Sequence, residues 1–203
     1  MSVARREQIT AVEEHGEAGG RSINWWGMIF FIASEALIFA NIIASFLYLE
    51  IRNGSWQVPT ELLVPVINTA ILLGSSFPIH YLAGRGIARG NQRNLRLGLF
   101  LTMLMGTIFL GGQLYEYSGL FGNNFTPQAS VFAGSFFTLT GFHGLHVTIG
   151  LIFLLIVWLR ALHGDFTAKK HWPVQAGEMY WHFVDGVWVV VFSTVYLLPL
   201  IRG

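Results

Sequence analysis

A few ionisable side chains interrupt the apolar stretches of this sequence, and their types allow chemistry. His143 and His146 form one pair, and His182 precedes Asp185 by the same spacing. Residues at i and i+3 share a face of a helix, so each pair would present its polar groups together. Glu35 lies in the middle of the first apolar stretch. In a membrane such groups cost several kcal/mol, so they face a bundle interior or a watery cavity.

Three kinds of chemistry remain open for these five residues. They can hydrogen-bond to one another and fix the register of the helices, in which case none needs to titrate. Glu35 can instead hold a proton at neutral pH, because burial disfavours a charged carboxylate, and this would suit a proton-linked or lipid-linked role. A metal site is the third possibility, since His-x-x-His plus carboxylates supplies ligands for zinc or di-iron. Di-iron bundles use Glu-x-x-His on separate helices, a pattern without a convincing place here, so we predict no metal ligands.

The composition indicates that these groups are positioned by membrane helices. Hydrophobic residues make up 53% and charged residues 11% of the 203 residues, whereas soluble domains carry roughly a quarter charged residues. A helix that crosses a bilayer needs roughly 20 apolar residues. Five stretches qualify, at about 23–49, 62–83, 95–118, 128–159 and 177–201. We predict an all-α, polytopic bundle of five transmembrane helices.

The same pattern divides the chain into a polar tail, 1–22, and a single transmembrane domain, 23–203. The formal charge of +1 gives no field that would attract nucleic acid. Pro65 and Pro78 lie inside the second span and predict a kink there. Glu116, near the outer end of the third span, is expected at the membrane interface.

Depths measured along the helices place the polar groups in one layer. At ~1.5 Å per residue from the cytoplasmic ends, Glu35 lies roughly 18 Å deep and His146 roughly 20 Å deep. Asp185 lies roughly 12 to 18 Å deep on the fifth span. The pairs are therefore expected to meet across the bundle.

The orientation follows from the basic residues, because lysine and arginine are retained on the cytoplasmic side. With the N-terminus inside, all of the 12 lysines and arginines except Arg52 and Arg202 fall on that side. The C-terminus is then periplasmic or extracellular. One cytoplasmic connection carries a group of arginines that could hold anionic lipid headgroups, namely Arg85, Arg89, Arg93 and Arg96.

The fourth span contains Gly-Phe-His-Gly-Leu-His at 141–146, and the fifth contains Tyr-Trp-His-Phe-Val-Asp at 180–185. Together these two motifs resemble subunit III of the cytochrome c oxidases. Further similar segments occur in order: Trp26-Gly27-Met28, Ser34-Glu35-Ala36, Asn68-Thr69, and Gln113 with Glu116-Tyr117. This combination is far more specific than any single His-x-x-His.

The resemblance implies a multi-pass subunit of a haem-copper terminal oxidase in the bacterial inner membrane. Such a subunit binds no haem or copper itself; these lie in the partner subunits, while structural phospholipids are expected on this chain. Subunit I would be the main contact, with subunit II in the same complex. The resemblance also implies a role in subunit I stability and in proton uptake during oxygen reduction. The family's intramembrane glutamate corresponds to Glu35, and the histidines and Asp185 correspond to polar packing positions.

Two departures from the family pattern matter. Long members have seven helices and this chain lacks the first two, so a small extra subunit could cover the exposed face. Gln175 stands where many members carry glutamate, and Glu178 lies three residues further on. Cytochrome c is the expected electron donor, with quinol as the alternative.

Two functions of other classes remain as rivals. A free-standing proton-coupled transporter would call for repeats and broken helices, and five spans without internal similarity argue against it. A membrane metalloenzyme would depend on His143 and His146 as ligands.

Overall fold

The computed structural model describes residues 22–53 and 62–202 of the chain, and in these ranges every regular element is a helix. Five helices are long and apolar enough to cross a membrane: Ile23–Asn53, Leu63–Ala88, Gln92–Gly122, Val131–Leu162 and Trp172–Leu200. The predicted all-α architecture with five membrane spans is therefore confirmed. The predicted polar tail lies outside the described residues, except for Ser22.

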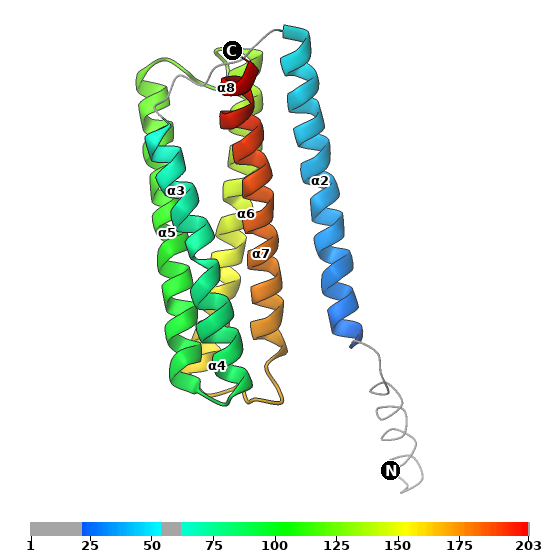
Figure 1. Cartoon of the computed structure of the whole chain (residues 1–203), viewed down its shortest axis with the longest axis vertical. Helices are drawn as coiled ribbons and strands as arrows, with labels where there is room; N and C mark the ends of the chain where they lie inside the picture. Colours follow the sequence, from blue (N-terminus) through cyan, green and yellow to red (C-terminus); the bar gives the residue numbers. More distant parts are fainter. Residues whose placement is uncertain (1–21, 54–61, 203) are drawn as a thin grey trace, which may run out of the picture.

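Four of the spans form a bundle and the first span lies along its side (Figure 1). The second span comprises α3 (Leu63–Gly74), the π-helix η1 (Pro78–Gly84) and α4 (Arg85–Ala88). The third and fourth are α5 (Gln92–Gly122) and α6 (Val131–Leu162). The fifth comprises α7 (Trp172–Phe192), the π-helix η2 (Ser193–Leu197) and α8 (Leu198–Arg202). The first span, α2 (Ile23–Asn53), packs against α6 and α7.

The centre of the bundle is filled by Trp181 of α7, which is fully buried. Glycines on two neighbouring helices make room for its indole. A Cβ at Gly106 of α5 would lie 2.7 Å from the Trp181 ring, and one at Gly150 of α6 would lie 3.1 Å from it. The indole nitrogen donates to Ser75 Oγ at 2.7 Å, which ties the centre to the second span.

The second span changes from α to π geometry at Pro78, whereas Pro65 sits in the first turn of α3. Proline in a helix interior removes a backbone hydrogen bond, and neighbouring groups must satisfy the freed carbonyls. Near this point the Thr102 hydroxyl of α5 lies 3.2 Å from the Ser75 carbonyl and 2.9 Å from the Gly98 carbonyl of its own helix. The interruption predicted for this span therefore lies at Pro78.

The fifth span begins earlier than the sequence suggested. Helix α7 starts at Trp172, with Pro173 in its first turn, rather than at Gly177. Proline is tolerated at the first helical position because its missing N–H would have no helical partner there. The connection before α7 and the one between α4 and α5 lie at one end of the molecule, the lower end in Figure 1, which we name the basic end.

The contact between α5 and η1 gives a test of this fold. A Cβ at Gly98 would lie 2.5 Å from Ala83 N and 2.6 Å from Pro78 O, both backbone atoms that cannot swing aside. We expect Gly98→Ala to lower the free energy of unfolding by about 1–3 kcal/mol, the usual cost of overpacking. Thermal unfolding in mild detergent, followed by circular dichroism, measures this.

Gly111→Ala is the matched control, because the same substitution on the same helix meets nothing within 4 Å. Its unfolding midpoint should equal or exceed that of the unaltered protein. Equal midpoints for both variants would contradict the close approach of α5 to η1.

Candidate functional site

Glu35 of α2 and His146 of α6 meet, as their similar depths predicted. His146 Nε2 lies 3.0 Å from Glu35 Oε2, and His146 Nδ1 donates to the Phe142 carbonyl at 2.9 Å. The rings of Phe39 and Phe142 lie 4.8 and 4.7 Å from the imidazole, between centroids. The histidine side chain is 6% exposed and the glutamate side chain 21% exposed.

This geometry places a proton between the two side chains. A carbonyl can only accept, so the Nδ1 proton of His146 is committed to Phe142. The hydrogen bond from Nε2 to Glu35 then needs one further proton, carried either by the carboxyl group or by the imidazole. Glu35 and His146 therefore hold one proton together, beside the rings of Phe39 and Phe142, and we name the pair the Glu35–His146 unit.

His143 does not join this unit, although it lies one helical turn away. It is fully buried, and its ring lies against Trp188 at 4.8 Å and Phe109 at 6.0 Å between centroids. Neither ring nitrogen has a hydrogen-bond partner among the described residues. His143 is thus surrounded by aromatic rings and does not contact Glu35.

His182 and Asp185 face the second span instead of α2. Ser76, between α3 and η1, donates to Asp185 Oδ2 and lies 3.0 Å from His182 Nδ1. The polar residues therefore form two groups on opposite sides of α7, with Trp181 between them, and His143 belongs to neither. Ser76 was missed in the sequence because a single serine in an apolar span carries no pattern.

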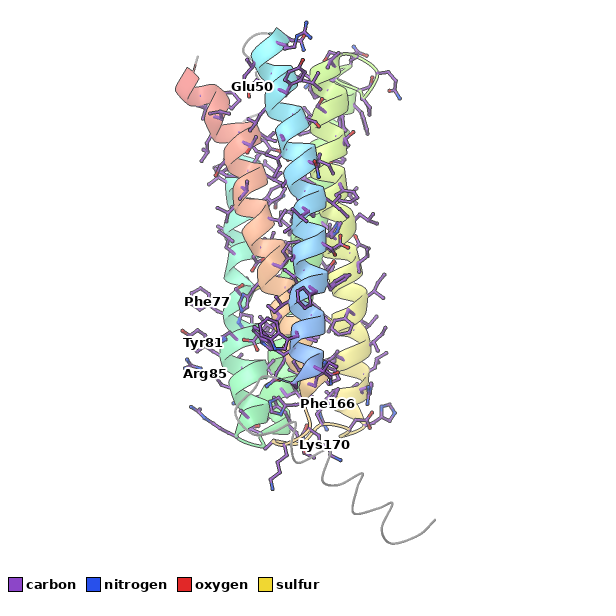
Figure 2. All side chains as sticks on the ribbon, turned by 90° about the vertical axis from the view of Figure 1, so that its right-hand side faces the viewer. Glu50, Phe77, Tyr81, Arg85, Phe166 and Lys170 are labelled. Carbon is purple, nitrogen blue, oxygen red and sulfur yellow. The ribbon has the colours of Figure 1, made fainter. Side chains whose placement is uncertain are left out.

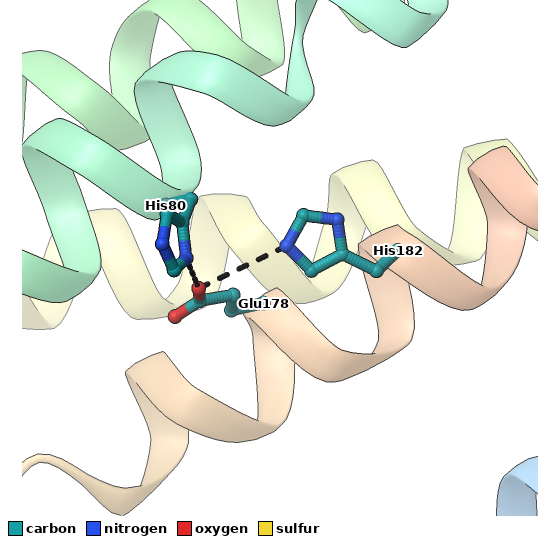
Figure 3. Close-up of side chains that lie close together, drawn as sticks. All are labelled: His80, Glu178 and His182. Carbon is teal, nitrogen blue, oxygen red and sulfur yellow. Dashed lines mark hydrogen bonds and ion pairs between the residues drawn. The ribbon is translucent and has the colours of Figure 1, made fainter.

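A second unpredicted contact adjoins His182 (Figure 3). His80 Nδ1 of η1 donates to Glu178 Oε1 of α7 at 2.5 Å, and His182 Nε2 lies 3.8 Å from the same oxygen. The sequence did carry a signal, because Glu178 and His182 are at i and i+4 on one helix face. The comparison with the family pattern assigned no role to Glu178.

The four arginines at the basic end differ in their surroundings. Figure 2 shows Phe77, Tyr81 and Arg85 projecting from one side of the second span, and the Arg85 guanidinium lies 4.5 Å from the Tyr81 ring centroid. Arg96 donates to the Ala161 carbonyl at 3.0 Å and so holds the end of α6. Arg89 and Arg93 are exposed.

Glu116, near the outer end of the third span, turns its side chain into the bundle rather than outward. It is 5% exposed, and it accepts hydrogen bonds from Tyr196 at 2.9 Å and from Gln113 at 3.2 Å. Burial is possible because these donors, on α5 and η2, surround the carboxylate. Position along a helix gives depth, but it does not give the side that faces the bundle.

The family model and the individual relatives that match this chain carry the same description. A family model described as cytochrome c oxidase subunit III matches residues 6–199. Cytochrome c oxidase subunit 3 of Thermostichus vulcanus is 41% identical over 176 residues, which are 85% of this chain and 86% of that protein.

Two further relatives carry the same description. The protein of Synechocystis sp. is 38% identical over 93% of this chain and 82% of its own length. The horse protein, from Equus caballus, is 37% identical over 84% of this chain and 68% of its own length. These matches agree with the motifs on α6 and α7 and with the five spans. The chain belongs to the cytochrome c oxidase subunit III family.

Proposed function

We propose that this chain is the non-redox subunit III of a cytochrome c oxidase in a bacterial plasma membrane. The observation that carries the proposal is the family match over residues 6–199, which spans nearly the whole chain. Subunits I and II of the same complex would hold the haem and copper groups, and this chain would stabilise subunit I. The family match favours this function over the free-standing transporter.

A lipid-binding role is supported by a groove between α2 and α7. The groove has a volume of about 570 Å³ and an almost entirely apolar lining, which includes Ala36, Ala40, Ala44, Phe183 and Gly186. The alanines leave space between helices that larger side chains would fill. The lining of α2 from Ala36 to Leu47 spans roughly 16 Å, long enough for much of a phospholipid acyl chain.

A proton-linked role is supported by the Glu35–His146 unit beside this groove. Glu35 precedes Ala36 of the groove lining, and its carboxyl group shares a proton with His146. A group that holds a proton without a net negative charge is stable next to lipid. We propose that the unit sustains proton uptake through subunit I by keeping α2 and a bound lipid in place.

The basic end would hold lipid headgroups. Arg89 and Arg93 are exposed there, and Arg85 is exposed beside Tyr81. Arg96 is engaged with the end of α6 and is the least available of the four.

Purification through a tag on this chain tests the assignment. In mild detergent we expect haem and a large multi-helix subunit to co-purify, because the family works inside an oxidase. Oxidation of reduced cytochrome c rather than quinol would support the proposed donor, and the reverse would favour the quinol oxidase alternative. A colourless, solitary chain in several detergents would contradict the proposal.

Infrared difference spectra test where the shared proton resides. We expect native protein minus Glu35→Gln to show a protonated carboxyl band at neutral pH, because a neutral His146 uses its proton on the Phe142 carbonyl and leaves Glu35 to supply the proton of the Nε2 contact. Asp165→Asn is the control, since Asp165 is 40% exposed and paired with Arg160, and it should give no such band. A signal from an ionised Glu35 alone would place the proton on His146. Haem content should be the same in all three proteins.

Filling the groove tests the lipid role. Ala40→Phe should reduce the phospholipid that co-purifies with the chain by about one molecule, as measured by mass spectrometry, because the ring would obstruct the groove in the middle of its α2 lining. Ala33→Phe, on the same helix but outside the groove lining, should leave the lipid content unchanged. Equal lipid content in both variants would show that the groove holds no tightly bound lipid.

A further inference from the structure

Three side chains with metal-binding atoms converge where η1 meets α7. They are His80, Glu178 and His182, and their ligand atoms all lie within 4.8 Å of one another. Figure 3 shows His80 on one element and the other two on α7, with the carboxylate between the imidazoles. Two histidines and one glutamate are the protein ligands of a group of zinc sites that keep a fourth position open.

We propose that His80, Glu178 and His182 form a binding site for a divalent transition-metal ion, for which zinc is the best fit. The proposal rests on the contacts of these residues and on the chemistry of the donor set. It does not depend on the electron donor, on bound lipid or on the proton of Glu35.

The distances suit an ion after small movements. Tetrahedral zinc with bonds of about 2.0–2.1 Å separates its ligand atoms by roughly 3.3 Å. The distances from Glu178 Oε1, 2.5 Å to His80 and 3.8 Å to His182, lie on either side of that value. Gly84 lets the carboxylate lie close to η1, because a Cβ at Gly84 would lie 2.6 Å from Glu178 Oε2.

The hydrogen bonds behind His182 orient its imidazole so that Nε2 faces Glu178. Ser76 donates its single hydroxyl proton to Asp185, so its oxygen accepts from His182 Nδ1–H. Through Nδ1, His182 is tied to the second span, and its Nε2 faces the carboxylate of Glu178 at 3.8 Å. A metal ion would replace any proton on that nitrogen, and a hydrogen-bond chain from a histidine ligand to an outer carboxylate is the usual support of a metal ligand.

The elements that carry the ligands hold them firmly. Glu178 and His182 share one face of α7 at i and i+4. His80 lies in η1, which the close contact with Gly98 presses against α5. π-helical turns are rare, and they are frequent at functional sites.

The site opens on the outside of the bundle, toward its basic end. The side chains of His80 and His182 are 41% and 45% exposed. Glu178 lies about 9 Å along α7 from its start at the basic end. This exposed side leaves room for a fourth ligand.

Zinc itself is the probe. The tagged chain is purified with all that accompanies it, treated with chelator, and equilibrated with radioactive zinc by dialysis. We expect the native protein to bind one more zinc ion than Glu178→Gln or His80→Gln. The zinc absorption-edge fine structure of that ion should show two imidazole nitrogens at about 2.0–2.1 Å.

Ser76→Ala separates a metal site from a simple ion pair, because it leaves all three ligands in place. Loss of the outer hydrogen bond should raise the Kd for zinc about 10- to 100-fold. His163→Gln is the control, since His163 is an exposed histidine in the connection after α6, and it should not change the Kd.

Two outcomes would overturn the proposal. One is equal zinc uptake by the native protein and the ligand variants. The other is a native spectrum without two imidazole ligands, which would make the cluster a hydrogen-bonded link between η1 and α7. The spectrum needs only the native protein, so it decides the question even if a variant fails to assemble.

Discussion

The packing of Trp181 is the interaction on which the rest of the structure depends. Its indole is fully buried against Gly106 and Gly150, and it donates to Ser75. One side chain thus joins α5, α6 and α7 to the second span. Buried aromatic residues contribute the largest apolar areas in a core, and a buried indole N–H needs a partner. Ser75 supplies this partner at the point where α geometry gives way to π geometry.

The residues on either side of Trp181, Tyr180 and His182, contact the two groups of polar residues on the two sides of α7. Tyr180 donates to the His146 carbonyl at 3.3 Å on one side, and His182 contacts Ser76 on the other. Consecutive residues on a helix point in directions about 100° apart, so fixing the indole fixes the two sides as well. The Glu35–His146 unit and the proposed metal site are therefore separate, and the same central contact positions both.

The depth of the polar residues along their spans and the family motifs could be predicted from the sequence. The neighbouring helix that each side chain faces could not. Equal depth was enough to bring Glu35 and His146 together, because α2 and α6 are neighbours and each offers a long polar side chain. It failed for His182 and Asp185, whose partner Ser76 is an ordinary hydroxyl residue. Depth also left open that Glu116 points into the bundle. His80 and Glu178 escaped notice because they are 98 residues apart in the sequence, and their contact depends on the π segment.

The light packing of α2 has a consequence for how this subunit changes over evolution. Only 11% of its most apolar window is buried within the chain, against 50% for the fifth span. Phe39 and Phe46 are buried, but most of the helix surface touches nothing else in the described part of the chain. Substitutions on that outward surface are therefore constrained by whatever surrounds the subunit in the membrane. Positions on this side of α2 should co-vary with neighbouring chains, while those around Trp181 co-vary with one another.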